Sequence, residues 1–268
     1  MDKKVVIITG ASSGIGLACA KEFSMQGYAV VLAARSLNKL ENIQSEIIAY
    51  NPDAFIVKAD VSIEQDCRVL MDETMKRFGR IDILINNAGI SMRALFKDLD
   101  LSVIHSLMNT NFWGTVYCTK HALPHILKQK GSIVGVSSIA GYMGLPGRTG
   151  YSASKYAMHG FLETVRIEHL KQKLHVMIVA PGFTSSNIRK TALSADGTIQ
   201  GETPRDENKM MPPELVAKVI YKGIRKRKRQ IILTIKGKLA VSLKRIFPAL
   251  VDFSSYREMK KEPNSPLV

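Results

Sequence analysis

The chain has 268 residues, of which 46% are hydrophobic and 23% charged. That balance is typical of a folded protein and excludes a generally disordered chain. The formal net charge is +15. Residues 205–268 alone hold 16 Lys/Arg against 6 Asp/Glu, so most of the positive excess lies at the C-terminal end. Such an excess is compatible with nucleic acid, with an anionic membrane surface or with solubility alone.

The sequence shows no signal of a secreted or membrane-spanning protein. MDKKVVIITG passes from two lysines into a short apolar run without a cleavage site, and no stretch approaches roughly 18 uninterrupted apolar residues. The cysteines at 19, 67 and 118 are widely spaced, and the histidines form no ligand spacing with carboxylates. We therefore expect a reduced, cytoplasmic protein with no metal site.

Seven short β-branched runs alternate with helical segments along the chain. Most of them are apolar at successive positions, as strands buried on both faces should be. The alternation predicts a seven-stranded parallel sheet with helices on both faces, as one Rossmann-type doubly wound α/β domain over 1–268. The runs are 4–9, 28–34, 54–60, 81–87, 131–138, 175–181 and 230–235.

Two segments interrupt this rhythm. Residues 183–211 form a long polar connection after the sixth run, which we interpret as a lid over a substrate. Residues 236–268 form a basic extension after the seventh run. Within it, Leu239, Leu243, Ile246 and Phe247 fall on one helical face flanked by lysine and arginine, a pattern that can lie on an anionic bilayer or cover the chain's own substrate pocket.

A glycine-rich turn, GASSGIG, lies between the first predicted strand and a helix, with Gly10, Gly14 and Gly16 spaced as GxxxGxG. Glycine lets the backbone approach a pyrophosphate closely, and the N-terminus of the following helix supplies N–H groups and a favourable dipole. The turn indicates a dinucleotide site, the alternative being a tight βα turn that binds nothing.

Tyr151 and Lys155 are four residues apart in a helix-forming stretch and therefore share one helix face. A nearby ammonium favours the phenolate form of a tyrosine, whose ordinary pKa of about 10 is too high for an efficient base near neutrality. The pair predicts acid–base chemistry, the alternative being a packed surface turn.

Further motifs accompany the glycine turn: NNAG at 86–89, Asn111, VSSIAG around Ser138, YSASK at 151–155, and Pro181 with Gly182. In order as well as in separation, these motifs resemble the short-chain dehydrogenase/reductase family. They cover residues 4–190, and the basic tail is similar to C-terminal extensions in the branch of dehydrogenase/reductase member 7 and 11-beta-hydroxysteroid dehydrogenase.

The resemblance implies roles for four catalytic residues. Tyr151 would give a proton to a carbonyl or take one from an alcohol, and Lys155 would also bond the nicotinamide ribose. Ser138 would bond the reacting oxygen, with Ser137 as the competing candidate. Asn111 would hold a water that links Lys155 to solvent.

The resemblance also implies a set of cofactor contacts. Asp60 and Val61 would touch the adenine, and Thr184 follows the PG pair near the nicotinamide. Asn87, Ala88 and Gly89 would line the adenine ribose and support the central strand. The full set is Gly10, Ser12, Ser13, Gly14, Ile15, Gly16, Arg35, Asp60, Val61, Asn87, Ala88, Gly89, Tyr151, Lys155, Pro181, Gly182 and Thr184.

The end of the second predicted strand indicates which cofactor is preferred. An acid here commonly accepts hydrogen bonds from the ribose of NAD, whereas a cation favours the 2′-phosphate of NADP. This chain has Ala34 at the acidic position, followed by Arg35. NADP(H) is therefore expected over NAD(H), although Ser13 stands where many NADPH-using relatives carry a second basic residue.

The basic run GIRKRKRQ at 223–230 could suggest nucleic acid, but no aromatic residue is interleaved for base stacking. It lies where a helix should end before the last strand, and cations are favourable there. We therefore interpret it as a solvated helix end, with contact to nucleic acid not expected.

The function predicted from the sequence is an NADPH-dependent carbonyl reductase or alcohol dehydrogenase. Apolar lid and tail positions, Phe183, Met210, Met211 and Phe247, favour a lipophilic ketone or secondary alcohol such as a steroid, long-chain keto compound or retinoid. The alternatives are a dinucleotide-binding protein without turnover and a reductase of small polar ketones. The resemblance further implies a homodimer or homotetramer, and peripheral membrane contact is a second expectation for the tail.

Overall fold

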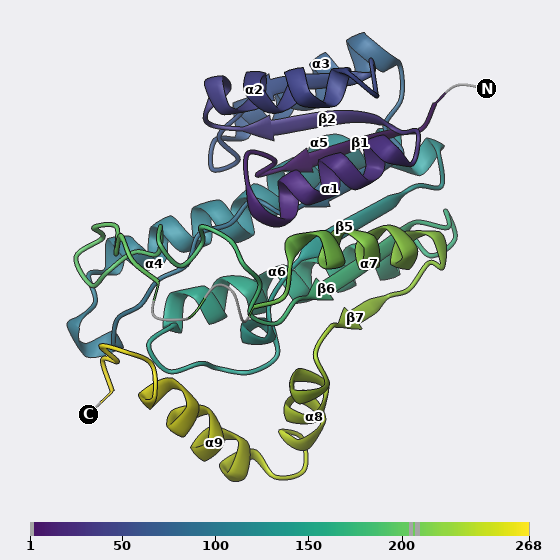
Figure 1. Ribbon diagram of the computed structural model, residues 1–268. Helices are drawn as coiled ribbons and strands as arrows, with labels where there is room; N and C mark the ends of the chain where they lie inside the picture. The colour runs from purple at the N-terminus through teal and green to yellow at the C-terminus, as the bar shows by residue number, and fades with distance from the viewer. Residues whose placement is uncertain (1–2, 204–205, 207–209, 268) are drawn as a thin grey trace.

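The computed structural model describes residues 3–203, 206 and 210–267 of the chain. Within these residues the strands form one sheet of seven in the order β3-β2-β1-β4-β5-β6-β7, with every pairing parallel. The predicted sheet is thereby confirmed (Figure 1). The strands are β1 Val5–Thr9, β2 Ala29–Ala34, β3 Ala54–Lys58, β4 Ile83–Asn86, β5 Ser132–Val136, β6 His175–Ala180 and β7 Gln230–Ile232.

Two buried clusters of side chains, one on each face, explain why the central strands are apolar at successive positions. On one face the sheet packs against helices α1, α2 and α7, and on the other against α3, α5 and α6. These helices are α1 Gly14–Met25, α2 Leu37–Ile48, α3 Glu64–Phe78, α5 Gly114–Lys128, α6 Thr149–Glu168 and α7 Pro213–Arg225.

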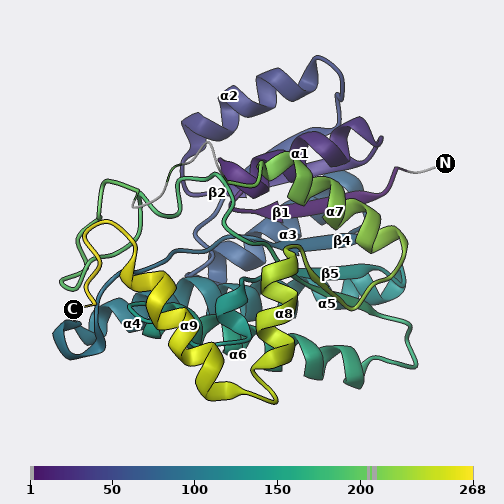
Figure 2. The same cartoon turned by 60° about the horizontal axis from the view of Figure 1, so that its bottom comes forward.

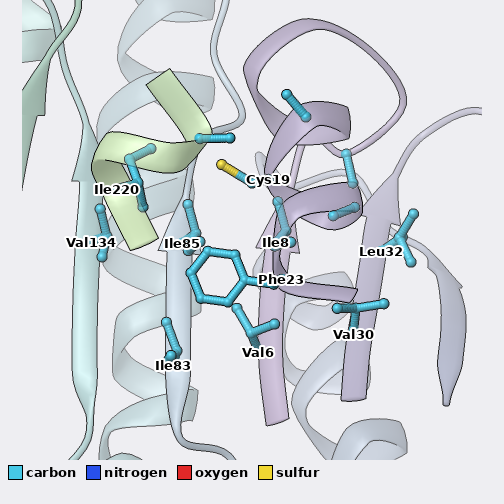
Figure 3. Close-up of a cluster of buried hydrophobic side chains, with 14 of the residues drawn as sticks. Val6, Ile8, Cys19, Phe23, Val30, Leu32, Ile83, Ile85, Val134 and Ile220 are labelled. Carbon is cyan, nitrogen blue, oxygen red and sulfur yellow. The ribbon is translucent and has the colours of Figure 1, made fainter. Parts of the chain in front are cut away.

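Phe23 of α1 shows how the first face is packed. Its ring is fully buried, lies close to Val6 and Ile85 in Figure 3, and makes edge-to-face contacts with Tyr28 and Tyr221. This packing fixes α1 on β1 and β4, and with it the turn that precedes α1.

The chain reverses direction across the sheet between β1 and β4, because β2 and β3 lie to one side and β5, β6 and β7 to the other. In doubly wound sheets, ligands bind beyond the carboxyl ends of the strands at such a switch point. The fold therefore places a binding crevice where the glycine turn, the NNAG segment and the start of α6 meet.

A π-helical turn, η2 Met108–Trp113, joins α4 Leu101–Leu107 to α5. Single π turns inside helices are uncommon and often lie at functional sites. Here the turn carries the buried residue Asn111.

The predicted lid is irregular over most of its length between β6 and α7, with isolated bridges Thr184–Met211 and Met92–Leu193. Residues 204–205 and 207–209 lie outside the described residues. After β7 the chain forms α8 Ile235–Leu243 and α9 Pro248–Lys260, which extend away from the sheet (Figures 1 and 2). None of the described helices has the length and apolar character needed to cross a bilayer.

The prediction that Leu239, Leu243, Ile246 and Phe247 share one face of a helix is wrong. Because α8 ends at Leu243, Ile246 and Phe247 lie in the connection to α9 and not on the same helix face as Leu239. All four side chains are nevertheless exposed, Ile246 to 70%. The basic run at 223–230 begins inside α7, which ends at Arg225, and reaches Gln230, the first residue of β7, so it includes the helix end as interpreted from the sequence.

Candidate functional site

A cleft of about 1010 Å³ lies at the carboxyl ends of the strands. Most of the predicted site residues line it, including Ser138, Tyr151 and Lys155. Gly16 and Asn111 do not line it. The predicted residues that do line it are Gly10, Ser12, Ser13, Gly14, Ile15, Arg35, Asp60, Val61, Asn87, Ala88, Gly89, Ser138, Tyr151, Lys155, Pro181, Gly182 and Thr184.

The glycine turn has the backbone geometry that requires glycine. Gly10 and Gly14 have φ of +66° and +53°, which is the left-handed region that side chains disfavour. A Cβ on Gly16 would lie 2.3 Å from the carbonyl oxygen of Gly10. The first turn of α1 contains no acidic side chain, and Ser13 makes no side-chain cap. The helix N-terminus therefore faces the cleft with the polarity that an anion requires.

Asn87 supports this turn from the neighbouring strand. Its amide nitrogen donates to the carbonyl oxygens of Thr9, at 2.9 Å, and Gly10, at 3.2 Å. The hydroxyl of Thr9 accepts from the backbone N–H groups of Asn87 and Ala88. The NNAG segment therefore holds the glycine turn in shape in addition to lining the cleft.

Helix α6 brings Tyr151 against Ser138, which follows β5. The oxygen of Ser138 accepts from the N–H of Ala140 at 3.2 Å, and its hydroxyl acts as a hydrogen-bonding group on the pKa of Tyr151. Ser137 bonds instead to Nε2 of buried His159, at 2.6 Å. The geometry therefore favours Ser138 over Ser137 as the partner of Tyr151.

The pKa of Tyr151 is raised, because burial penalises the phenolate. The hydrogen bond from Ser138 and the charges of Arg148 and Arg189 act in the opposite direction. The cations that oppose the burial of Tyr151 are thus arginines that the sequence analysis did not single out.

Lys155 is almost fully buried, and burial lowers its pKa to about 8. Its ammonium donates to the carbonyl oxygen of Val136 at 2.9 Å and lies 5.9 Å from the centre of the Tyr151 ring. Lys155 is not among the causes of the shift in the Tyr151 pKa, and the expected acidification of Tyr151 by Lys155 stays a prediction.

Asn111 is fully buried and its side-chain amide is fully engaged. Its oxygen accepts from the N–H of Ile90, and its nitrogen donates to the carbonyl oxygen of Ile90 and to the hydroxyl of Ser154. The side chain thereby ties the segment after β4 to α6, one residue before Lys155. Its expected role in a proton path stays a prediction.

At the far end of the cleft, the predicted adenine-side residues meet at the ends of β2 and β3. Arg35 is exposed and lies 4.0 Å from Asp60, whose carboxylate also accepts from the N–H and hydroxyl of Ser62. Lys39 of α2, which sequence reasoning missed, lines the same end. Its spacing of four residues from Arg35 was the available signal.

The opposite end of the cleft adjoins a small apolar cluster. A cluster that includes Met92, Val103 and Leu107 packs between α4 and the lid, with partly buried Tyr151 against it. Phe183 lines the cleft as expected, whereas Met210, Met211 and Phe247 do not. At the end of β6, a Cβ on Gly182 would lie 2.4 Å from the side chain of Thr234, so this contact requires glycine.

Sequence reasoning missed several residues at this end, including Arg148, Arg189, Met259 and Glu262, all of which line the cleft. Arg148 precedes Tyr151 by three residues and could have been noticed from that spacing. The other three come from the lid and the tail, where no motif sets their position. In the residues that the structure describes, no group of His, Cys, Asp or Glu is arranged to hold a metal ion.

Comparison with known sequences identifies the family. The sequence model described as short chain dehydrogenase matches residues 4–197, which include the glycine turn, Ser138, Tyr151 and Lys155. The chain belongs to the short-chain dehydrogenase/reductase family. The predicted branch is also confirmed by the relatives to which the chain is similar.

One relative, the 11-beta-hydroxysteroid dehydrogenase-like 4A of Arabidopsis thaliana, is 44% identical over 195 residues, which are 72% of this chain and 65% of that one. This short-chain dehydrogenase therefore spans less than two thirds of that relative. The dehydrogenase/reductase SDR family member 7B of Mus musculus is 33% identical over 252 residues, covering 92% of this chain and 78% of that one.

A solved structure shows the same fold. The short-chain dehydrogenase/reductase from Burkholderia phymatum, in complex with NAD, superimposes with a TM-score of 0.83 at 22% identity, over 93% of this chain and 95% of that one.

Proposed function

We propose that this protein is an NADPH-dependent carbonyl reductase or alcohol dehydrogenase. The observation that carries the proposal is that the hydroxyls of Ser138 and Tyr151, with Lys155 one turn further along α6, belong to residues that line the same cleft as the glycine turn. A reacting carbonyl placed beside these two hydroxyls would meet a proton donor and a second hydrogen-bond donor.

The residues present fit a nicotinamide dinucleotide. The left-handed glycines at 10 and 14 let a pyrophosphate approach the backbone, and the uncapped N-terminus of α1 favours its charge. When bound, the nicotinamide supplies or accepts the hydride.

The protein's own groups would handle the proton and the oxygen. Tyr151 donates its phenolic proton to the carbonyl oxygen during reduction and accepts one during oxidation. Ser138 holds the same oxygen, and Lys155, fixed by the carbonyl of Val136, places a cation below the phenol ring. Because burial raises the pKa of Tyr151, the protonated form that reduction needs predominates near neutrality.

The preference for NADPH is supported by charge at the end of β2. Arg35 and Lys39 both line the cleft there, and Ala34 leaves no carboxylate at the strand end. Two cations close to this position suit a 2′-phosphate better than a bare ribose hydroxyl. Asp60, 4.0 Å from Arg35, holds that guanidinium near the cleft.

A lipophilic substrate is supported by apolar side chains that line the cleft, namely those of Val103, Leu145, Phe183, Leu193 and Met259. The name of one relative, an 11-beta-hydroxysteroid dehydrogenase-like protein, is compatible with a steroid, and a long-chain keto compound or a retinoid would also suit these apolar side chains. A small polar ketone would leave these apolar side chains exposed to water in the cleft.

The test is oxidation of NADPH and, separately, of NADH, followed by absorbance with a panel running from sugars and polar keto acids to steroid and long-chain ketones. Turnover of the apolar members with NADPH supports the proposal. Turnover confined to small polar ketones overturns the substrate class, and a preference for NADH overturns the cofactor. Cofactor binding without turnover of any member overturns the enzyme and favours a dinucleotide-binding protein.

We further propose that the tail touches an anionic membrane surface from the cytoplasmic side. Exposed apolar side chains of α8, α9 and their connection, including Ile235, Ile246 and Phe253, stand beside lysines and arginines on the same two helices. Apolar atoms together with cations suit a negatively charged lipid surface. Sedimentation with vesicles tests this, and binding should require anionic lipid and fall with salt.

A homodimer or homotetramer is the proposed assembly. Exposed Leu101, Trp113 and Tyr156 on α4, η2 and α6 offer apolar surface for a second copy. Sedimentation equilibrium should give a mass of two or four chains, and a monomer at micromolar concentration would overturn this proposal.

A further inference from the structure

The C-terminal end of the chain returns to the substrate end of the cleft. In Figure 2 the yellow segment after α9 comes back beside α4 and the green lid. Met259 and Glu262 line the same cleft as Tyr151, and both side chains are buried. The hydroxyl of Ser265 donates to the carbonyl oxygen of Met259 at 2.9 Å, which folds the segment into a compact turn.

Glu262 lies between two guanidinium groups. Its carboxylate is 3.6 Å from Nε of Arg93 and 3.5 Å from Nη2 of Arg148. The three side chains are only 3%, 7% and 12% exposed, respectively. Arg93 also donates to the backbone carbonyl of Pro263. Buried ion pairs depend strongly on both partners, because removal of one leaves an uncompensated charge in a dry environment.

The two arginines belong to the parts of the molecule that shape the substrate end. Arg148 immediately precedes α6 and stands three residues before Tyr151. The backbone N–H of Arg93 donates to the carbonyl oxygen of Leu193 in the lid at 2.8 Å. Glu262 therefore joins the tail to the catalytic helix and, through the segment after β4, to the lid.

The part of the tail that follows Glu262 also contacts the loop before α6. A Cβ on Gly147 would lie 3.4 Å from the ring of Pro266, so this loop and the tail pack directly on each other. The carbonyl oxygen of Gly147 in turn accepts from the N–H of Ala94. The tail therefore contacts the body of the protein both before Glu262, at Met259, and after it, at Pro266.

We propose that Glu262 is a specificity-determining residue, which fixes the tail as the outer wall of the substrate pocket and offsets the charge of Arg93 and Arg148. This proposal rests on the proposed reductase function. With Glu262 in place, the wall presents Met259 to a neutral lipophilic substrate. Without it, the positive charge of Arg148, which lines the cleft, and of buried Arg93 next to it favours a substrate that carries an anionic group.

The kinetic test compares Glu262→Gln with Glu258→Gln, which removes an equal charge from an exposed position on α9. The substrates are methyl decyl ketone and the keto acid that carries a carboxylate in place of its terminal methyl group. Glu262→Gln should raise the KM of the ketone about tenfold with kcat changed less than about threefold, and should shift kcat/KM toward the keto acid by about tenfold or more. Equal effects on both substrates, or the same shift in Glu258→Gln, would overturn the proposal.

A second measurement does not depend on turnover. Trypsin cleavage after the exposed residues Lys260 and Lys261 should be several-fold faster in Glu262→Gln than in Glu258→Gln, because the tail is released from the body. Titration of NADPH fluorescence should give the same affinity in both variants. If the wild-type protein reduces no ketone, the proposed function is wrong, but the rate of proteolysis still tests whether Glu262 fixes the tail. An unchanged rate of proteolysis in Glu262→Gln would contradict the proposal that Glu262 fixes the tail, even if the enzyme is active.

Discussion

The hydroxyl of Ser137, the residue before Ser138, lies 2.6 Å from Nε2 of His159. The imidazole of His159 also packs edge-on against Tyr142, at 4.5 Å between ring centres, and fills the space below Gly141. His159 therefore supports the strand end from which Ser138 reaches the candidate substrate, although it does not line the cleft.

Protonation of His159 should destabilise the fold in acid. Burial, with a smaller contribution from the charge of Lys155, lowers the pKa of His159 from 6.5 to about 4. The unfolded chain therefore takes up this proton first as the pH falls, and stability is lost between about pH 6.5 and pH 4. The loss is at most about 3 kcal/mol. Urea unfolding of His159→Gln across this range should show a weaker acid dependence than wild type, and an unchanged dependence would contradict the assignment.

Lys155→Met should raise thermal stability while it removes turnover. Burial lowers the pKa of the Lys155 ammonium from 10.5 to about 8, so keeping it charged near neutrality destabilises the fold by up to about 3 kcal/mol. Methionine has similar length and no charge, although it leaves the carbonyl of Val136 without this donor. Calorimetry at neutral pH should show a higher Tm than wild type, with no such rise in the exposed control Lys128→Met. A lower Tm would show that the hydrogen bond outweighs desolvation.

Arg35→Glu should reverse the cofactor preference. The substitution removes a cation from the end of β2 and places a carboxylate beside Ala34, the position at which an acid commonly accepts from the ribose hydroxyls of NADH. The Kd for NADPH should rise about 10- to 100-fold and that for NADH should fall, as measured by nucleotide fluorescence. Lys128→Glu, with the same charge change away from the cleft, should leave both constants nearly unaltered. Equal weakening of both nucleotides by Arg35→Glu would contradict the assignment.

Substitution of two helical glycines by alanine should have opposite effects on stability, because only one of them is packed against the glycine turn. Gly16→Ala places a Cβ 2.3 Å from the backbone oxygen of Gly10, which cannot move without distorting the turn. Stability should fall by about 2 kcal/mol or more, and nucleotide binding should weaken. Gly160→Ala meets nothing within 4 Å on α6 and should stabilise by about 0.5–1 kcal/mol. Chemical denaturation of the two variants checks both signs, and a stable Gly16→Ala would refute the packing of the turn.

The strands and the motif residues could be predicted from the sequence because they depend on features of short, continuous segments of the chain. Continuous apolar runs require burial on both faces, and the glycine turn needs left-handed backbone at Gly10 and Gly14. The seven strands, their parallel pairing and the placing of Tyr151, Lys155 and Ser138 in one cleft follow from that pattern.

The substrate end could not be predicted, since it depends on contacts between segments far apart in the chain. Glu262 meets Arg148 across 114 positions, and neither residue belongs to a motif. The hydrogen bond of Lys155 to Val136 is likewise invisible in the spacing of YSASK. The extent of α8 was misjudged because an apolar periodicity does not mark the turn before Pro248.

Tyr151→Phe tests the central claim most directly, since it removes one hydroxyl and preserves the ring. NADPH affinity, measured by fluorescence titration, should change less than about twofold. Reduction of the best ketone in the panel should fall by about 10²–10⁴, the usual contribution of a positioned acid. Retained turnover with intact NADPH binding would contradict the assignment of Tyr151 as the proton donor, and with it the proposed mechanism.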